Sequence, residues 1–549
     1  MTITERKNNF LFLAIALIHL IPLWLFTYFP SQDGPAHMET AYILANFHNA
    51  GLERIHEYID LKPTWSPNIL MQYFLAGLIF FMNPLIAEKI LLSIYVLAFP
   101  FSFRYWMRGV LGKPHAAEFM IFPFIYNYFV YKGFYNFIFS VIGFFLIMGL
   151  YERNRNGLKF TSAVLLFILI VINYFCHILG TFYACLCIGI LSLAYITADF
   201  TKEPFSTRKL LRRLVPVVLV VLPVAIFMLF FIGEEDMLPY RFIDFLRIKN
   251  NFPSLKDSIW RWINFDVITA FEPWENWARM MPIILFGCCL VAFASSKADS
   301  KTWHRRNGIY FVLFLALLVI YFCTPYMMLS AGLLNQRAAL FPYLAIIIWF
   351  GSIRLKPLVG VLIIVLSLAS SLSYFAARYP LHEAINTQYR EFARLNDRIE
   401  DHSTILPLIF SPHIQYDATG RSVASYFKMM EVFKHVSAHL TFGKDIVEFT
   451  FYPANQPHFP VHFKRNKNPY LFIGDIESVP PMVDFLPYAK TGREIIVDYV
   501  VVWGIYSNHF HGKRTNHIEA QLNAGYDLIY SSQNNGHLLL FRRKGFTSG

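Results

Sequence analysis

The sequence has few charged residues and few cysteines for its length. Charged residues make up 15% of its 549 positions, whereas 56% are hydrophobic, and soluble domains of ordinary composition carry about 25% charged residues. All six cysteines lie in or beside apolar runs, and the last of them is Cys323. This distribution excludes the disulfide framework of small secreted domains and the usual cysteine-rich zinc site.

Several catalytic motifs are also absent. The sequence contains no Walker-type phosphate loop and no G-x-S-x-G nucleophile elbow, which disfavours an ATP-driven pump and a serine hydrolase. It contains no internal repeat of solenoid length. The net charge of +12 arises mainly from short basic clusters between apolar runs. This placement is typical of cytoplasmic loops of membrane proteins, so the basic balance does not indicate nucleic-acid binding.

What the sequence has in abundance is long apolar runs, which recur from Phe10 to Phe375. With about 20 apolar residues needed per crossing, they predict a polytopic α-helical membrane protein of about 11–13 transmembrane helices. The first run lacks a small-residue cleavage site, so we expect a retained helix and not a signal peptide. The predicted spans begin near Phe10, Ile69, Ile86, Ala116, Phe134, Phe160, Ile178, Leu214, Met280, Gly308, Arg337 and Pro357.

Basic clusters between the runs predict the orientation, because cytoplasmic loops are enriched in Lys and Arg. They place the N-terminus in the cytoplasm, and they place loop 30–67, the turns at Lys132 and His177, and everything after the last span outside. Residues 68–103 look like two short spans, yet the clusters around them require an odd number of crossings. A re-entrant or surface-lying segment would reconcile the two observations.

The tail has the composition of a soluble domain. We therefore predict a transmembrane domain over residues 1–376 and an external soluble α/β domain over residues 377–549. Helical patterning covers 381–399 and 517–523, and Asn535-Gly536 is typical of a hairpin turn. Strand-like runs cover 404–410, 470–473, 495–503, 527–531 and 537–542.

The stretch Ser31-Gln32-Asp33-Gly34-Pro35-Ala36-His37 directly follows the first span. Aspartate before Gly-Pro is typical of a helix start, in which Asp33 caps the free amides. Asp33 and His37 are one helical turn apart and can face the same way. The helix that follows has an apolar stripe, which favours a position on the membrane surface. Its members are Met38, Ala41, Tyr42 and Ala45.

A polytopic chain with an acidic motif right after the first span and a C-terminal external domain resembles the GT-C glycosyltransferase superfamily. The resemblance implies transfer of a sugar from a polyprenyl-phosphate or polyprenyl-diphosphate donor to a glycan, lipid or protein acceptor at the external face of the inner membrane. It also implies that Asp33 is the general base or a metal ligand. Many members pair two acidic residues there, whereas Gln32 and Gly34 flank a single aspartate. This difference favours base catalysis and leaves a divalent cation as an open alternative.

Three further groups are candidates for binding the donor phosphate, together with His37. Arg337, with the preceding Gln336 as a further candidate, lies at the external end of an apolar span, where a guanidinium can grip phosphate or serve as a snorkelling anchor. Lys132 is either a second phosphate ligand or an ordinary turn lysine. His177 interrupts an apolar stretch, which indicates either function or a structural hydrogen bond.

An acidic cluster in a later external loop, Glu234-Glu235-Asp236, is either a solvated loop or a site for a divalent cation. The rival to an enzyme is a transporter or scaffold in envelope polysaccharide assembly, which would bind a lipid-linked glycan without cleaving it. An enzyme requires Asp33 to lie close to a cation, whereas a scaffold does not.

Overall fold

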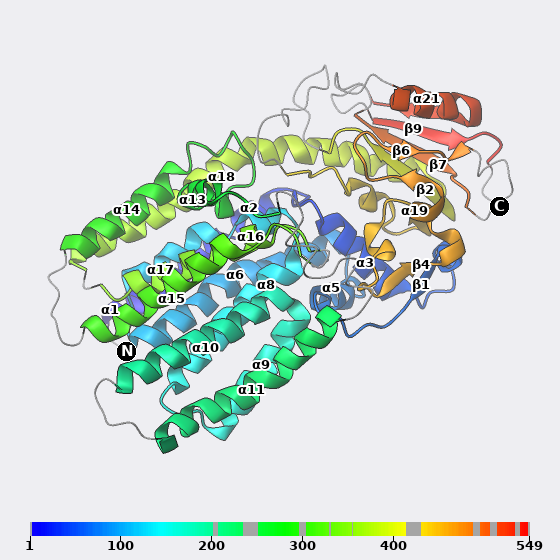
Figure 1. Cartoon of the computed structure of the whole chain (residues 1–549). Helices are drawn as coiled ribbons and strands as arrows, with labels where there is room; N and C mark the ends of the chain where they lie inside the picture. The colour runs from blue at the N-terminus through cyan, green and yellow to red at the C-terminus, as the bar shows by residue number, and fades with distance from the viewer. Residues whose placement is uncertain are drawn as a thin grey trace.

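The computed structural model describes ten segments of the chain, in which a long helical bundle carries a sheet-containing region beyond one of its ends (Figure 1). The acidic cluster 234–236 and the predicted hairpin turn at Asn535-Gly536 lie outside the described residues. The described segments are 3–200, 207–233, 251–295, 303–328, 331–353, 355–412, 430–486, 495–504, 513–532 and 538–546.

The bundle confirms the prediction of a polytopic helical membrane protein. Within the described residues, six helical stretches are long and apolar enough to cross a membrane, and five further apolar helices are shorter. The long stretches are α1 with α2 (Ile3–Ile18, Ile21–Leu25), α6 (Pro84–Leu111), α8 (Tyr135–Asn154), α10 (Ile178–Phe200), α11 (Thr207–Gly233) and α18 (Pro357–Ala393). The shorter ones are α5 (Leu70–Ile79), α9 (Phe160–Cys176), α14 (Met280–Ser295), α15 (Trp303–Cys323) and α16 with α17 (Leu334–Ala338, Leu340–Phe350).

Two of the predicted spans are not long α-helices. Helix α5 has ten residues and is therefore about 15 Å long, half of the about 30 Å hydrocarbon core. Only α6 in this region has the length of a span, as the re-entrant or surface-lying alternative requires. The span predicted from Ala116 does run through the bundle, but it is not an α-helix, because it begins as the 3₁₀ helix η1 (Ala116–Phe124) with Pro123 inside it. Proline cannot donate the backbone hydrogen bond that an α-helix needs there.

Helix η1 nevertheless carries the chain along the bundle. Near its start, Glu118 pairs with Arg104 and Arg108 of α6 at 2.6 and 3.0 Å. After η1 comes the one-turn helix α7 (Tyr128–Tyr131), and the Tyr131 carbonyl accepts a hydrogen bond from Gln32, beyond the first span. The loop after the first span and the turn at Lys132 therefore meet at the same end of the bundle.

The C-terminal region contains a five-stranded mixed sheet in the order β3-β2-β7-β9-β8. Strand β2 is parallel to β3 and β7, whereas β9 is antiparallel to β7 and β8. The strands predicted at 404–410, 495–503, 527–531 and 537–542 all contribute. The strands are β2 (Ser403–Ile409), β3 (Ile446–Glu448), β7 (Tyr499–Trp503), β8 (Tyr526–Ser531) and β9 (Leu538–Arg543), and helix α21 (Lys513–Gly525) precedes β8.

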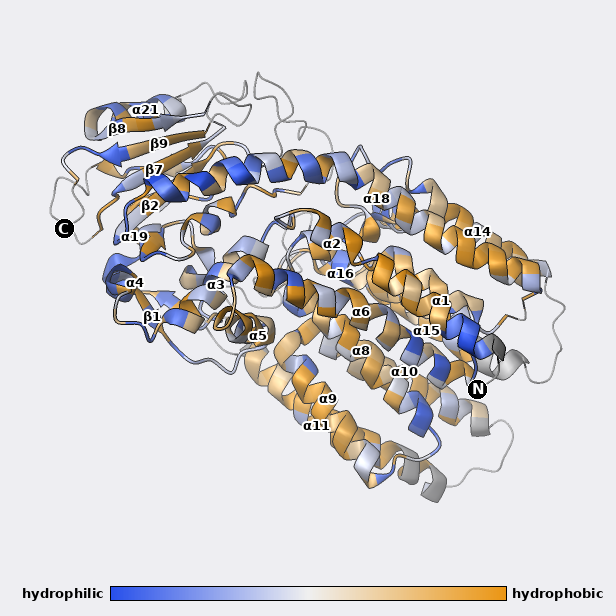
Figure 2. Cartoon of the chain, turned by 180° about the vertical axis from the view of Figure 1, so that it is seen from behind, coloured by the Kyte–Doolittle hydropathy of each residue, from blue (hydrophilic) through white to orange (hydrophobic). Residues whose placement is uncertain are grey.

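One predicted strand is wrong. Residues 470–473 belong mainly to the short helix α19 (Pro469–Phe472), because Asn468 caps its start and Pro469 suits the first turn. The helix predicted at 381–399 is the end of α18, followed by the 3₁₀ helix η4 (Arg394–Arg398). Figure 2 shows α18 changing from hydrophobic residues beside the bundle to hydrophilic ones near the sheet. A single helix thus connects the two regions.

Loop 30–67 packs against the bundle and the C-terminal region. Helix α3 (Gly34–Asn46) is buried along almost its whole length and packs against α5, α6 and the 3₁₀ helices η6 (Val436–Leu440) and η7 (Tyr452–Asn455). After α4 (Glu53–Tyr58), strand β1 (Ile59–Leu61) pairs with β4 (Val461–Phe463). The surface position expected for α3 is therefore wrong, because protein covers both its apolar stripe and its opposite face.

Candidate functional site

Asp33 does not act as a cap for α3. Its backbone is already helical, with φ −97° and ψ −7°, and its carboxylate accepts no capping hydrogen bond from the helix. Instead, the side-chain amide of Gln32 donates to Asp33 Oδ1 at 3.1 Å. The first turn of α3 therefore makes no use of this carboxylate, which leaves it available for other chemistry.

The turn after α7 holds Asp33 in place through close backbone contact. The Asp33 amide donates to the Lys132 carbonyl at 3.2 Å. Gly133 has φ +75°, and a Cβ atom at this position would lie only 2.4 Å from the backbone nitrogen of Gly34. Both the left-handed conformation and the lack of space require glycine there. The sequence Lys132-Gly133 thus positions both a cation and the loop that carries Asp33.

Basic and polar side chains from both regions of the protein surround the Asp33 carboxylate. Lys132 Nζ donates to Gln32 Oε1, so Gln32 bridges the lysine and the aspartate. From the C-terminal region, His435 Nε2 lies 3.8 Å from Asp33 Oδ1. The neighbouring Lys434 pairs with Glu477 at 3.3 Å. The site is thus assembled from the first external loop, the turn at Lys132 and the segment before η6.

These surroundings tune the protonation of the site. Burial raises the pKa of Asp33 above its ordinary value, and the charges of Lys132 and Lys434 oppose this effect. Burial lowers the pKa of Lys132. Burial, with Lys434 as a further cause, holds the pKa of His435 well below 6.5, so this ring is neutral at pH 7. A carboxylate with a raised pKa, close to a neutral imidazole, is well suited to accept a proton.

Arg337 lies near this group and is buried. It is 8% exposed, so its guanidinium does not snorkel into solvent, and the snorkelling interpretation is wrong. Its Nη1 lies 3.2 Å from His177 Nε2, and the guanidinium carbon is 4.4 Å from the centre of the Phe134 ring. The charge of Arg337 contributes to lowering the pKa of Lys132. The structure thus brings together Asp33, Lys132, Arg337 and His177.

Three buried polar atoms beside this arginine have no hydrogen-bond partner among the described residues. They are Arg337 Nε, Asn335 Oδ1 and Gln336 Oε1. Most buried polar groups in proteins are hydrogen-bonded, because an unpaired one costs about 1–3 kcal/mol. The unpaired Nε leaves Arg337 able to donate to a ligand, whereas Asn335 and Gln336 line a small pocket whose wall does not include Arg337.

His37 has a different partner from the one its spacing suggests. Gln72 of α5 donates its amide to His37 Nδ1 at 3.0 Å, and the ring lies beside Tyr135. Burial lowers the pKa of His37 to about 4. The neutral ring thus links α3 to α5 instead of pairing directly with the Asp33 carboxylate.

Sequence reasoning missed a buried carboxylate beneath the loop. Tyr135 donates to Glu88 Oε1, and its hydroxyl lies 3.1 Å from Ser31 Oγ. A Cβ atom on Gly34 would collide with all three of these groups. Glu88 was visible as an ionisable residue in an apolar run, and such a residue is a functional candidate by default.

A second missed pair joins α3 to the sheet. Glu39 and Glu448 are 2% and 3% exposed, and a hydrogen bond between their carboxyl groups requires a shared proton. Ser437 also donates to Glu448 at 2.7 Å. Burial, followed by the nearby charge of Glu448, raises the pKa of Glu39 well above its ordinary value of 4.5. No local pattern in the sequence predicts this pairing.

The described residues contain no group of three or more His, Cys, Asp or Glu side chains placed to hold a metal ion. The other acidic residues suggested for a cation, Glu234, Glu235 and Asp236, lie outside the described segments. The geometry therefore adds no ligand to Asp33, and the open alternative of a divalent cation rests on the sequence alone.

The apolar helices define the chain as an integral membrane protein. No protein-family model matches the chain, and no curated protein matches it. Among solved structures, it is similar to the crystal structure of ArnT from Cupriavidus metallidurans bound to undecaprenyl phosphate. The similarity covers 97% of both chains at 11% sequence identity, with a TM-score of 0.49. A similarity at this level assigns no activity to the chain.

Proposed function

We propose that this protein is a GT-C-type glycosyltransferase that moves a sugar from a polyprenyl-phosphate-linked donor to an acceptor hydroxyl at the external face of the inner membrane. The observation that carries the proposal is the position of Asp33. Its carboxylate does not cap α3, lies close to Lys132 and His435, and shares its surroundings with Arg337. This combination provides a base and cations for a departing phosphate at one place.

In the proposed reaction, Asp33 accepts the proton of the acceptor hydroxyl while the hydroxyl oxygen attacks the anomeric carbon of the donor sugar. The bond between that carbon and the phosphate oxygen breaks, and its electron pair leaves with the polyprenyl phosphate. Arg337 and Lys132 stabilise the charge that develops on the phosphate. The raised pKa of Asp33 makes it a better proton acceptor than an exposed aspartate once it is ionised.

Arg337 is the stronger candidate for direct contact with the phosphate. Its Nε has no partner among the described residues, and a planar guanidinium binds two phosphate oxygens at once. Lys132 is already hydrogen-bonded to Gln32, so it acts mainly through its charge. His177 Nε2 lies 3.2 Å from Nη1 of this guanidinium, while His177 Nδ1 accepts a hydrogen bond from the Leu179 amide.

The positions of the charged residues along α6 support an external location of the Asp33 site. The Arg104–Glu118–Arg108 cluster lies toward the C-terminal end of α6, whereas Glu88, next to the Asp33 loop through Tyr135, lies near its N-terminal end. Since basic clusters favour the cytoplasm, we assign the Asp33 end and the sheet-containing region to the external side, with the N-terminus inside.

The direct test is sugar transfer by the purified protein in lipid nanodiscs, with a panel of polyprenyl-phosphate sugars as donors. We expect Asp33→Asn to lower kcat by about 10²–10⁴-fold, the usual contribution of a general base, while donor binding is retained. The matched control is Asp60→Asn, because the Asp60 side chain is 53% exposed and belongs to β1. We expect this variant to keep the activity of the parent.

Equal activity of Asp33→Asn and the parent would remove Asp33 from the mechanism. Binding of the donors without turnover by the parent protein would instead support the transporter or scaffold alternative. Unfolding midpoints of all variants in the same nanodiscs separate a loss of catalysis from a loss of structure.

A further inference from the structure

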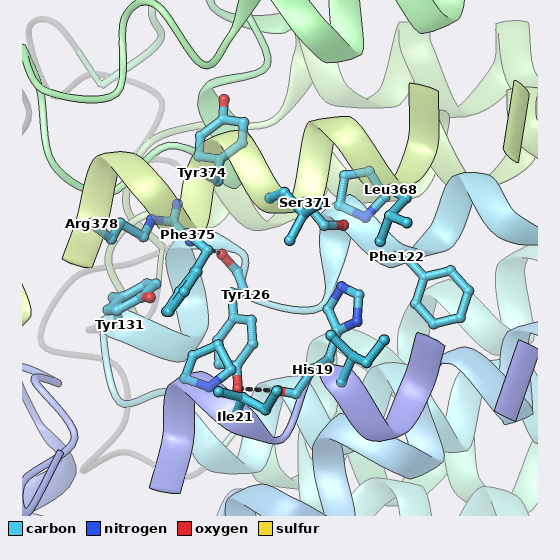
Figure 3. A pocket seen from close by; sticks show the side chains of 14 residues that line it. His19, Ile21, Phe122, Tyr126, Tyr131, Leu368, Ser371, Tyr374, Phe375 and Arg378 are labelled. Carbon is cyan, nitrogen blue, oxygen red and sulfur yellow. Dashed lines mark hydrogen bonds between the residues drawn. The ribbon is translucent and has the colours of Figure 1, made fainter. Parts of the chain in front are cut away.

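An apolar cavity whose wall does not include Asp33 lies between the break in the first span, η1 and α18. Its volume is about 130 Å³, similar to engineered apolar cavities of about 150 Å³ that bind benzene. Its wall includes Phe122, Leu368, Leu372 and Phe375, and Figure 3 shows the side chains that line it. Leu372 is 49% exposed on an apolar helix of the bundle, so the bilayer has access to this side of the cavity.

The break in the first span places a histidine at this cavity. Helix α1 ends at Ile18 and α2 begins at Ile21, with Pro22 in its first turn. Because proline interrupts the helical hydrogen bonds, backbone carbonyl groups at the break need other partners. The Tyr126 hydroxyl donates to the His19 carbonyl at 2.6 Å. In Figure 3 the His19 ring extends from the break toward α18.

The hydrogen bond of the ring determines which kind of group the other nitrogen can bind. His19 Nδ1 lies 2.8 Å from the Ile15 carbonyl. A carbonyl only accepts hydrogen bonds, so Nδ1 carries the hydrogen, and Nε2 of the neutral ring is an acceptor. The cavity wall contains no carboxylate and includes the cationic Arg378, which disfavours a protonated ring. An acceptor without a partner can be satisfied only by a donor.

His19 Nε2 is buried and has no hydrogen-bond partner among the described residues, and the residue is 7% exposed. Two polar residues of the wall, Arg378 and Ser371, donate to other partners. Arg378 donates to Glu275 at 2.5 Å and to the carbonyl groups of Tyr126 and Ile268. The Ser371 hydroxyl donates to the backbone of its own helix. The ligand itself therefore has to supply the hydrogen.

We propose that this cavity binds a membrane-soluble molecule that carries a hydroxyl group. The hydrocarbon part would occupy the apolar wall, and the hydroxyl would donate to His19 Nε2. An apolar chain alone would leave this nitrogen unsatisfied, whereas a water molecule needs two to four polar partners and finds a wall that is mainly apolar. The site does not depend on sugar transfer, because Asp33 does not line it.

A photoreactive alcohol tests the proposal directly. The parent protein in phosphatidylcholine nanodiscs is irradiated with a diazirine-bearing octanol, and adducts are mapped by mass spectrometry. We expect adducts at Leu368, Leu372 and Phe375, with the lipid-exposed Ile168 of α9 as internal reference. 1-Octanol should compete for the cavity about fivefold better than its methyl ether, the ratio set by one neutral hydrogen bond.

Variants at His19 test the hydrogen bond. His19→Phe removes the acceptor and should lower cavity labelling about fivefold. His19→Asn should preserve labelling, because its amide can donate to Ile15 while its oxygen accepts from the ligand. Leu368→Trp fills the cavity without changing His19 and should abolish labelling there. The monodispersity and unfolding midpoint of each variant report whether it is folded.

Three results would overturn the proposal. Equal competition by the alcohol and its methyl ether would show that the cavity takes apolar chains without a hydrogen bond to His19. Cavity labelling that persists in Leu368→Trp would place the ligand elsewhere. Labelling at Ile168 without adducts in the cavity would show that no alcohol enters. The competition experiment uses the parent protein only, so it decides the question even if His19→Phe fails to fold.

Discussion

Replacement of Gly133 by alanine should disrupt both the fold and the proposed chemistry. The left-handed backbone at Gly133, φ +75°, costs an alanine about 1–2 kcal/mol. Its Cβ would lie 2.4 Å from the Gly34 nitrogen and 2.9 Å from the Asp33 backbone. Relief of such a clash by backbone shifts typically costs about 1–3 kcal/mol more. We therefore expect a total loss of about 2–5 kcal/mol in the free energy of unfolding.

Gly112→Ala is the matched control. Gly112 has almost the same backbone, φ +72°, but a Cβ atom there has no neighbour within 4 Å. Only the conformational cost of about 1–2 kcal/mol applies. The difference between the two variants isolates the contact with the Asp33 loop. Equilibrium unfolding of both variants in detergent micelles measures this difference.

Activity gives a second measure of the same perturbation. A shift of about 1 Å in a catalytic group can cost about 10²-fold in rate, so Gly133→Ala should lose most sugar transfer at temperatures where it is still folded. Gly112→Ala should retain the activity of the parent. Losses of stability that agree within about 0.5 kcal/mol, with equal activity, would refute the role assigned to this glycine.

The other predictions concern charge. Lys132 is the strongest of the effects that oppose the raised pKa of Asp33. Since a base acts only when ionised, the kcat for sugar transfer should rise with pH through the pKa of Asp33. Lys132→Met removes an opposing charge and should move this rise to higher pH in a kcat–pH profile. An unshifted profile would contradict the influence of Lys132 on Asp33. Burial raises the pKa of Glu39 in the folded protein. Its contribution to the free energy of unfolding is therefore most favourable below about pH 4.5, the ordinary pKa, and is lost as the pH rises toward the folded pKa. Glu39→Gln supplies a permanent donor to Glu448 and should flatten this fall in thermal unfolding measured across pH, whereas an unchanged slope would exclude a shared proton. Arg337→Lys keeps the charge but loses the planar fork that stabilises the developing phosphate charge, so kcat/KM for the donor should fall about tenfold, with kcat included in the loss; an unchanged kcat/KM would show that Arg337 does not grip the phosphate.

Local features of the sequence were sufficient to predict much of the site. Asp33 and Lys132 each lie next to glycine in a short polar segment between apolar runs, and Arg337 opens such a run. Because a chain that leaves the bilayer on one side re-enters from the same side, these residues were expected at one end of the bundle. In the structure, Asp33 and Lys132 are linked through Gln32, and the charge of Arg337 acts on Lys132.

Errors arose where neighbouring elements override a local signal. Asp33 before Gly-Pro has the pattern of a cap, yet its carboxylate faces other partners. Helix α3 has the apolar stripe of a surface helix, yet the C-terminal region covers its other face. The apolar run after Ala116 is long enough for a span, but Pro123 was a visible signal that an α-helix would be interrupted.

The sequence by itself determined that this is a membrane protein with many apolar helices and a mixed α/β tail, because hydrophobic runs and strand patterns act over a few residues at a time. Only the tertiary structure decided that His435 lies beside Asp33, that burial beside Glu448 raises the pKa of Glu39, and that His19 keeps an unpaired acceptor. The first two contacts join segments that are far apart in the chain. The third depends on the absence of a hydrogen-bond donor near the His19 ring among the described residues. Periodicity indicates which face of an element is apolar, whereas only packing determines what covers that face.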